Sequence, residues 1–529
     1  MNLIFDPWLT FLMKDGSEKK LPMTEISNPE VLDFLLPRPD FQGAAYQFAI
    51  GLLQTVFAPK DKYEWHKHYV NPPSESELLG ALNKVKNAFN TTGTGPLFMQ
   101  DFDDLDDINP TPISSLLIDA PGEKARKRNT DHFVKRGFGD VMSPEMANIA
   151  LFTLQINAPA GGSGIRTGLR GGGPLTTLVM PQTSVSSLWE KIWLNVVNRD
   201  FWRYPDPDFN SALLFPWLAA TRESGKGGSN IFQNDVHPLH MFWAMPRRIR
   251  LEIDDSLMTC KVSGLQTNLS ISGFRAKNLG GNYIGSWDHP LTPYKWDPKA
   301  EDAEQLSIKG SQSGLNYKIW DQLTFTDSSR GQRCAKVIEH FYAISNGFSK
   351  TQRAVPQLLV FGYDLDKMKP RGWYSKAMPL FSVPEAQQEE ILLQVKQLQE
   401  IAADVLWHCR TQIKEAWFSR PGDVKGDVSF VDLSFWQRTE TAFYLAVQQL
   451  IENAVSTDPF LTPEQAKIWL SAIRSVSTDL FDEFALSELG ADRSMSKRIK
   501  ARHKLTGWLF SKKPTNPICA FMAENNFET

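Results

Sequence analysis

The chain has 529 residues, of which 42% are hydrophobic and 11% aromatic, enough to build about two to four domains with buried cores. Its formal net charge of −3 is nearly balanced, which argues against a protein that coats nucleic acid by bulk charge and leaves only local patches for such contacts. No apolar run reaches about 18 residues, so we expect no membrane span, and an N-terminus without a basic region ahead of its apolar residues predicts a cytoplasmic protein.

The N-terminal part of the chain predicts strands followed by helices. Residues 3–13 and 21–26 indicate a β-hairpin around an Asp-Gly turn. Residues 28–59 predict a short helix and then a longer one ended by proline, and residues 74–89 predict a further helical segment.

The middle of the chain predicts loops first and then more strands. Residues 101–110 (DFDDLDDINP) are interpreted as a solvated acidic loop, and residues 121–129 (PGEKARKRN) as a basic one. A helix is expected over 144–154 and a strand over 176–180 (TTLVM). Residues 243–343 are rich in strand formers and in Gly, Asn and Asp, so we expect mostly β-structure there.

From residue 384 onward, apolar residues recur at helical spacing. The pattern predicts four helices, over 384–417, over 435–455, from Thr462-Pro463 onward, and over 494–510. Connections of this length favour an antiparallel four-helix bundle. The last helix carries a basic run, which is either a solvated face or a strip for nucleic-acid backbone.

These patterns together predict an α+β protein with a large mixed N-terminal domain, residues 1–372, followed by an all-α C-terminal four-helix bundle, residues 373–529.

The stretch 158–174, APAGGSGIRTGLRGGGP, has seven glycines in seventeen residues. Glycine inside an element costs roughly 0.5–1 kcal/mol relative to alanine, so bare backbone at this density indicates a use. Neither the P-loop pattern GxxxxGK[ST] nor the dinucleotide pattern GxGxxG is present. Three interpretations stay open: a surface loop with many turns, a loop that lets a large ligand come close while Arg166 and Arg170 meet phosphates, and the nucleotide- or phosphate-binding loop of an enzyme.

No pattern predicts a metal site, a cofactor or a catalytic residue. His66 and His68 stand at i and i+2, a strand or loop spacing, and His237 and His240 form HxxH without a third ligand. The aspartates of 101–107 lack the glycine and glutamate of a calcium loop. No cysteine pair is spaced as CxxC, and no GxSxG motif occurs.

Several segments resemble one family in the same order along the chain. They are NLIFDPWL, YEWHKHYVNPPSESE, GPLFMQ, IALFTLQINAPAGGSGIRTGLRGGGPLTTLV, ISGFRAKNLGGNYIGSWDHPLTPY and LLVFGYDLDKMKPRGW, with a helical region closing the chain. They are similar to the CasA family, the large subunit of the type I-E CRISPR surveillance complex Cascade. The order of the segments is more specific than any one of them.

The resemblance implies a subunit without catalysis, antiviral in role, that works in an RNA-guided complex. It would recognise the protospacer-adjacent motif (PAM) in double-stranded DNA through the minor groove, help open the duplex, and recruit a helicase-nuclease. Its partners would be the other Cascade subunits with their CRISPR guide RNA, which reads the rest of the target by base pairing.

The resemblance also implies site residues, by position. The loop entering the minor groove corresponds to Ala160, Gly161, Gly162, Ser163 and Gly164, the lysine that contacts the PAM to Lys277 or Asn278, and the wedge beside the PAM to Asp366, Lys367 and Met368. A loop that contacts the nucleic-acid-bearing neighbours corresponds to 133–141, with Phe133 and Lys135 as its contact residues. Cysteine pairs of some relatives have no counterpart near Cys260, so no zinc is expected. A scaffold without nucleic-acid contact remains a further alternative.

Overall fold

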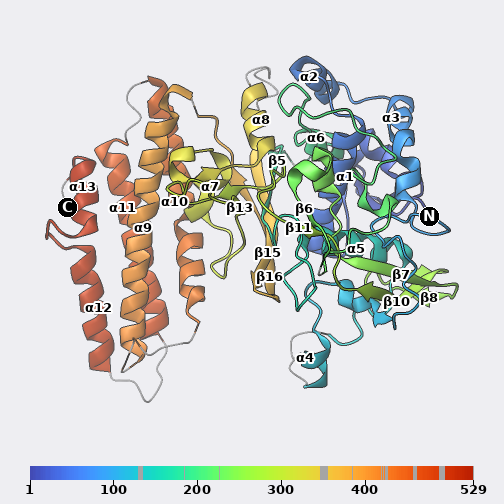
Figure 1. Cartoon of the computed structure of the whole chain (residues 1–529). Coiled ribbons are helices and arrows are strands. Elements are labelled where there is room, and N and C mark those ends of the chain that lie inside the picture. Colours follow the sequence, from blue (N-terminus) through green and yellow to red (C-terminus); the bar gives the residue numbers. More distant parts are fainter. Residues whose placement is uncertain are drawn as a thin grey trace. The chain divides into compact units, whose positions relative to one another are not determined.

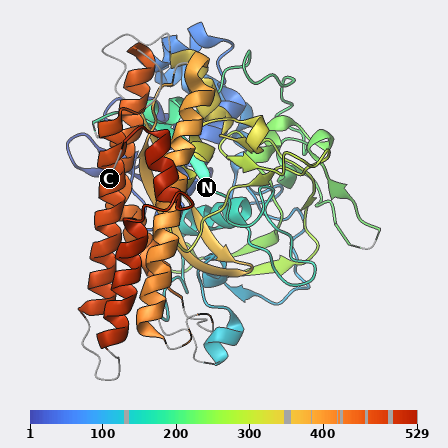
Figure 2. The ribbon, with the colours of Figure 1, turned by 90° about the vertical axis from the view of Figure 1, so that its left-hand side faces the viewer.

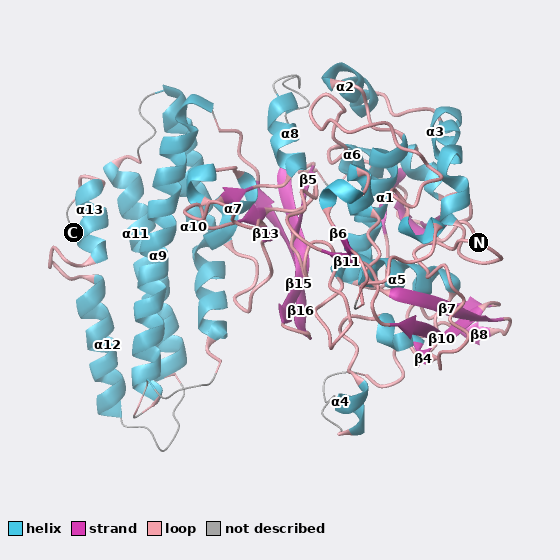
Figure 3. Ribbon diagram, viewed as in Figure 1, coloured by secondary structure: helices cyan, strands magenta, loops and turns pink. Residues whose placement is uncertain are grey.

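The structure, a computed structural model, describes residues 1–128, 135–183, 185–225, 227–345, 356–383, 385–418, 420, 422, 427–456, 461–487 and 495–527. The chain forms two compact units: Met1–Gly310 with Phe325–Met378, and Ser311–Thr324 with Pro379–Thr529 (Figure 1). The first unit mixes helices and strands and the second is helical (Figure 3), which confirms the expected fold class. Gly372, where the sequence places the domain boundary, is a residue of strand β16 (Lys369–Pro379) in the first unit.

The first unit begins with a small antiparallel sheet in the order β2-β1-β3. Strands β1 (Leu9–Met13) and β2 (Glu18–Leu21) form the expected hairpin, in which Gly16 has a φ of 80°. The short helix expected after residue 28 is wrong, because β3 (Val31–Phe34) pairs with β1 there. An isolated helix of that length is unstable, whereas pairing satisfies the backbone polar groups of the segment.

Helix α1 (Pro39–Val56) is the centre of the first unit and is buried along nearly its whole length. It packs against α5 (Pro144–Asn157) and α6 (Leu188–Trp193). A Cβ on Gly43 would lie 2.8 Å from the Phe361 ring, so glycine allows α1 to approach the strand that carries Phe361. Phe48 of α1 lies at the middle of an aromatic core, with ring centroids at 5.4–5.9 Å from those of Trp8, Phe89, Phe98, Phe152 and Trp243.

Two further sheets carry the segments that resemble the CasA family. One has the order β4-β10-β7, with β4 at Thr111–Pro112, β10 at Ser270–Lys277 and β7 at Arg248–Asp254. The other has the order β16-β15-β5, with β15 at Gln357–Asp366 and β5 at Thr176–Met180, where a strand was expected. Figure 1 shows β15 and β16 side by side.

Shorter elements complete the first unit. The expectation of β-structure over 243–343 is correct only in part, because α8 (Lys336–Ser345) and α7 (Trp320–Thr324), of which α7 belongs to the second unit, also fall in this range. The remaining elements are α2 (Lys62–Val70), α3 (Glu75–Leu82), α4 (Glu123–Lys127), β6 (Asn230–Ile231), β8 (Met258–Thr259), β9 (Gln266–Thr267), β11 (Asn282–Tyr283), β12 (Tyr294–Lys295), β13 (Leu306–Ser307) and β14 (Gln332–Arg333).

The second unit is built on long helices that run alongside one another, coloured orange to red in Figure 2. They are α9 (Gln388–Trp417), α10 (Ser429–Ser456), α11 (Pro463–Phe481) and α12 (Met495–Leu509), followed by the shorter α13 (Pro517–Glu524). Thr462 caps α11 with Gln465 in a capping box, as the Thr-Pro pattern predicts.

A segment from outside these helices completes the core of the second unit. The Tyr317 ring stacks on Phe443 at 4.2 Å between centroids, and the hydroxyl groups of Tyr317 and Thr439 are 2.8 Å apart. Residues 311–324, which include α7, therefore belong to the second unit. Among the described helices, none combines the length and the apolar character needed to cross a bilayer.

Candidate nucleic-acid interface

The glycine-rich loop leaves the C-terminal end of α5 at Ala158 and returns to the same place at Gly168, ten residues later. Its base is closed by the Gly168 amide, which donates to the Ala158 carbonyl at 2.9 Å. A Cβ on Gly168 would lie 3.2 Å from the Ala158 nitrogen, so glycine allows the two ends of the loop to approach closely. Arg247 donates from Nη2 to the Pro159 carbonyl at 2.6 Å and holds the start of the loop. These two hydrogen bonds connect the base of the loop to the rest of the unit.

The tip of this loop lies at the surface. Ala160, Gly162 and Ser163 are exposed, and Gly161 and Gly164 are partly exposed. A Cβ built on Gly162 would meet no atom within 4 Å, so the missing side chain leaves no gap for the protein itself to fill. The bare backbone at Gly162 therefore faces open space, where a ligand can reach it.

The second group of glycines has a structural use. A Cβ on Gly172 would lie 3.0 Å from the Pro159 Cα, and one on Gly173 would lie 2.9 Å from both the Leu365 side chain and the Tyr363 carbonyl. These residues therefore pack the base of the glycine-rich loop tightly against β15. Among the seven glycines, Gly162 is the one with open space at its Cβ position, whereas at the tip a Cβ on Gly161 would lie 2.3 Å from the Ile165 side chain.

The two arginines of the stretch differ in environment. Arg166 donates from Nε to the Ser224 hydroxyl at 2.6 Å and from Nη2 to the Ser224 carbonyl at 2.5 Å, which leaves Nη1 for a ligand. Arg170 is 5% exposed and donates to Gln47 and Thr176, so the expectation that it meets a phosphate is wrong. Burial lowers the pKa of Arg170 to about 10. Its side chain turns inward because Gln47 of α1 and Thr176 of β5 supply acceptors there.

The structure brings Lys277 and Asn278 next to the glycine-rich loop. The Leu279 amide donates to the Gly164 carbonyl at 2.8 Å. Gly164 has a φ of 78°, and its Cβ would lie 3.2 Å from that of Asn278, so both conformation and space require glycine. Lys277 and Asn278 are both exposed, and the Lys277 Nζ lies 3.8 Å from a Glu223 carboxylate oxygen.

Asp366 is the last residue of β15, Lys367 and Met368 form the turn to β16, and all three are exposed. Lys367 has a φ of 56°, a left-handed conformation that suits a tight turn, and Met368 is 55% exposed. Tyr363, three residues before the turn, donates its hydroxyl hydrogen to buried Asp40 at 2.5 Å. Since neighbouring Leu365 packs on the base of the glycine-rich loop, a continuous set of contacts connects the turn, the loop and Leu279.

Of the two contact residues expected in 133–141, Phe133 lies outside the described residues. Lys135 is exposed. The Phe138 ring lies 5.8 Å from the Arg38 guanidinium, which pairs with Asp40 through two hydrogen bonds of 2.9 and 3.0 Å. The end of this segment is thereby connected through Arg38 and Asp40 to the β15–β16 hairpin.

The acidic segment 101–107 is solvated only in part. Asp101 is fully buried and accepts a hydrogen bond of 2.6 Å from Arg248 Nε, so the prediction is wrong for this residue. Asp104 and Asp106, with 72% and 84% of their side chains exposed, do face solvent. Although burial opposes the charged form, hydrogen bonds and charges of Asp101 and Glu223 raise the pKa of Arg248.

Glu223 and Ser224 contact the residues of the candidate interface, although the sequence patterns do not single them out. Ser224 accepts from Arg166, its amide donates to the Leu279 carbonyl at 3.1 Å, and its hydroxyl donates to the Gly280 carbonyl at 2.7 Å. A second glycine run, SGKGGS over 224–229, is the signal that would have found this segment.

The histidine pairs are structural. His66 and His68 lie on α2 and not on a strand or loop, so two positions apart they point to different sides of the helix. His240 is buried, contacts the Tyr283 hydroxyl at 3.0 Å, and has its pKa lowered to about 4 by burial. Within the part of the chain that the structure describes, no group of three or more His, Cys, Asp or Glu side chains is placed to hold a metal ion.

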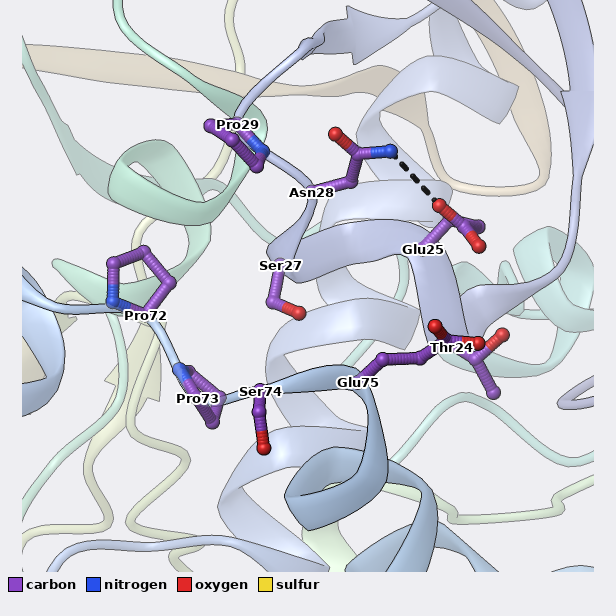
Figure 4. A pocket seen from close by; sticks show the side chains of 9 residues that line it. All are labelled: Thr24, Glu25, Ser27, Asn28, Pro29, Pro72, Pro73, Ser74 and Glu75. Atoms are coloured by element: carbon purple, nitrogen blue, oxygen red, sulfur yellow. Dashed lines mark hydrogen bonds between the residues drawn. The ribbon is translucent and has the colours of Figure 1, made fainter.

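A surface pocket of about 420 Å³ lies between the segment Met23–Ser27 and the start of α3 (Figure 4). Asn28 donates to Glu25 within it, and Glu75 faces it from α3. The described residues that line it are Thr24, Glu25, Ser27, Asn28, Pro29, Pro72, Pro73, Ser74 and Glu75. Because these include two carboxylates and no basic side chain, the pocket is unsuited to a phosphorylated ligand.

Solved structures with the same fold are of CRISPR-associated proteins. Thermobifida fusca Cse1 superposes with a TM-score of 0.68 at 16% identity, covering 99% of this chain and 98% of that one. Thermus thermophilus CasA (Cse1) gives a TM-score of 0.65 at 16% identity, covering 99% of each chain. A chain of a CRISPR RNA-guided surveillance complex gives 0.64 at 13% identity, covering 97% of this chain and 99% of that one. At these identities the similarity establishes the fold.

The family model of the CRISPR-associated protein Cse1 (CRISPR_cse1) matches residues 2–480, nearly the whole chain. The protein therefore belongs to the Cse1 family, also called CasA, as the resemblance in the sequence predicts.

Proposed function

We propose that the protein is the large, non-catalytic subunit of an RNA-guided Cascade complex and recognises the PAM of double-stranded DNA from the minor groove. The observation that carries the proposal is the exposed backbone at Ala160, Gly162 and Ser163, joined through Gly164 to the segment with Lys277 and Asn278. The other Cascade subunits with their guide RNA would read the remaining target by base pairing. Recruitment of a helicase-nuclease belongs to the same proposal and rests on family membership.

A bare backbone suits the minor groove for a steric reason. That groove is about 6 Å wide, so a chain without Cβ atoms enters where side chains would clash, and its amides meet the acceptors on the base edges. Gly162 has no neighbour within 4 Å in the direction of its missing side chain, which is the geometry such an entry requires. Because A·T and T·A pairs show similar acceptors on this side, we expect partly degenerate PAM recognition.

The β15–β16 turn supplies the element for duplex opening. Met368 is an exposed apolar side chain at a tightly turned tip, and Lys367 beside it would meet a phosphate. Inserted apolar side chains unstack a base step at a cost of a few kcal/mol, which contacts with the separated strands offset. Leu365 anchors the turn to the base of the glycine-rich loop, so PAM recognition and opening would act on adjacent base pairs.

The alternative, an enzyme that binds a nucleotide through the glycine-rich loop, has less support. It needs cations at the loop, but Arg170 is buried and Arg166 is engaged with Ser224 through two nitrogens. It predicts binding of ATP or GTP to the isolated chain in calorimetry and loss of that binding in Arg166→Ala.

The proposal is tested in a complex reconstituted with guide RNA. We expect Gly162→Asp to weaken binding of a PAM-bearing duplex at least about tenfold, because a carboxylate placed in the groove repels DNA. Gly80→Asp, on α3, is a matched control with equally open space and the same change of charge. Complex assembly should be intact in both variants, and equal duplex affinity in both would refute the assignment of the loop.

A further inference from the structure

The sheet β4-β10-β7, whose strand β10 ends at Lys277, carries four basic side chains on one face. The register of β7 and β10 pairs Arg250 with Arg275 and Arg248 with Lys277. Residues directly opposite in an antiparallel pair share a face, and so do residues two positions apart along a strand. These four side chains, called the basic ladder below, therefore lie on the same face of the sheet.

The acidic segment lies across this ladder. Asp101, at its start, makes a fully buried pair with Arg248, which holds the segment in place. The carboxylates that follow pair with the arginines of the ladder in turn. These pairs are Arg248–Asp103 at 2.9 Å, Arg250–Asp104 at 3.1 Å and Arg275–Asp106 at 2.9 Å.

The pairs differ in how easily another anion can replace the carboxylate. Arg248 and Asp101 are 1% and 0% exposed, so separating them would leave a buried charge unpaired, at a large penalty. Asp104 and Asp106 are mostly in solvent, where water and salt screen the attraction, so these pairs contribute little. Arg275 also donates from Nε to the Glu252 carboxylate at 2.7 Å. This hydrogen bond would keep the guanidinium in place when a phosphate displaces Asp106.

A DNA phosphate fits the positions that Asp104 and Asp106 occupy. Arginine binds phosphate and carboxylate oxygens with the same geometry, and phosphate binding also releases counterions from DNA. The ladder is continuous with the proposed PAM contact, because Lys277 is its last residue and Asn278 and Leu279 follow directly.

We propose that Arg250 and Arg275 bind the phosphate backbone of the duplex beside the PAM. When DNA is absent, Asp104 and Asp106 form ion pairs with these two arginines. The inference rests on the proposed function and adds a second DNA contact to it. Since the acidic side chains compete with every duplex, they suppress weak binding to DNA that lacks a PAM.

The competition is measured in the reconstituted complex as duplex affinity against salt concentration. We expect Asp104→Asn to raise affinity about three- to tenfold at low salt, for duplexes with and without a PAM. Arg250→Gln should lower affinity and reduce the slope of log affinity against log salt by about one. Asp206→Asn removes the same charge from an exposed pair with Arg199 and should leave affinity unchanged.

A double-mutant cycle separates the proposal from a general charge effect. If Asp104 competes with phosphate for Arg250, the gain from Asp104→Asn disappears in the Arg250→Gln background. A gain that persists there, or that Asp206→Asn reproduces, would overturn the proposal, as would an unchanged salt slope in Arg250→Gln. Thermal unfolding of each variant verifies that the fold is retained.

This test also distinguishes failure of the ladder from failure of the PAM assignment. The affinity for a duplex without a PAM tests the basic ladder alone. The loss of preference for a PAM-bearing duplex in Gly162→Asp tests the glycine-rich loop alone.

Discussion

The carbonyl of Gly164 accepts a hydrogen bond of 2.8 Å from the amide of Leu279, and this bond joins two segments that lie far apart in the sequence. It sets the exposed backbone around Gly162 beside the exposed side chains of Lys277 and Asn278. In the proposed function, the loop and the segment that follows β10 would therefore meet DNA together.

Gly164→Ala tests this relationship. The new Cβ would sit 3.2 Å from that of Asn278 in a residue with φ of 78°, so we expect a stability loss of about 1–2 kcal/mol and a displaced Leu279. PAM-duplex affinity of the reconstituted complex should fall. Gly285→Ala, with φ of 83° and its nearest atom at 3.9 Å, should lose similar stability and retain affinity. Equal affinities in the two variants would contradict the prediction.

Met368→Ala should slow opening of the duplex without weakening the fold. Met368 is 55% exposed, so truncation should change the free energy of unfolding by no more than about 0.5 kcal/mol. Opening is followed by the fluorescence of a base analogue placed beside the PAM. A duplex with mismatched bases at that position needs no wedge and should restore the wild-type rate. A defect that persists on the mismatched duplex would show that Met368 acts elsewhere.

Lys367→Gly removes the neighbouring side chain while keeping the turn. A φ of 56° strains lysine but not glycine, so the hairpin should be as stable as in the wild type. If Lys367 meets a phosphate, the salt dependence of duplex binding should decrease by about one unit of slope. An unchanged slope would exclude that contact.

Tyr317→Ala should destabilise the second unit by about 3–5 kcal/mol, because the ring stacks on Phe443 in the core. Tyr317→Phe removes only the hydroxyl contact with Thr439 and should cost about 1 kcal/mol. Chemical denaturation of the whole chain measures both. Tyr63→Ala is the control, since Tyr63 is 74% exposed, and it should be nearly neutral.

His240 should make the protein less stable in mild acid. Burial lowers its pKa to about 4, whereas the unfolded chain titrates near 6.5, so between these values only the unfolded state binds the proton. Stability is therefore lost as the pH falls from about 6.5 to about 4, by roughly 2 kcal/mol at pH 5. The difference in unfolding free energy between pH 7.5 and pH 5 should shrink by this amount in His240→Gln. An equal difference in both proteins would rule out His240 as its source.

Local patterns predicted much of the fold correctly. The capping residue Thr462, the Asp-Gly turn at Gly16 and the apolar period of α9 act over a few residues, so they can be recognised without knowledge of the rest of the chain. The density of glycine in 158–174 is also a local signal, although it left three interpretations of the stretch open; in the structure Gly162 is exposed and its Cβ position is open.

Predictions that depended on distant partners were wrong. Arg170 was expected to meet a ligand and Asp101 to be solvated, yet both are buried with partners more than a hundred residues away. The strand β3 was expected as a helix because its pairing with β1 is tertiary and leaves no local signal.

The glycines of 158–174 show which properties the sequence determines by itself and which depend on the tertiary structure. Their number alone indicates a main chain that another group, either of this protein or of a ligand, can approach closely. Whether that partner is the protein itself, as for Gly173 against Leu365, or open solvent, as for Gly162, depends on which segments the fold packs around each residue. Such packing is decided by the free energy of the whole core, so no short stretch of sequence contains it.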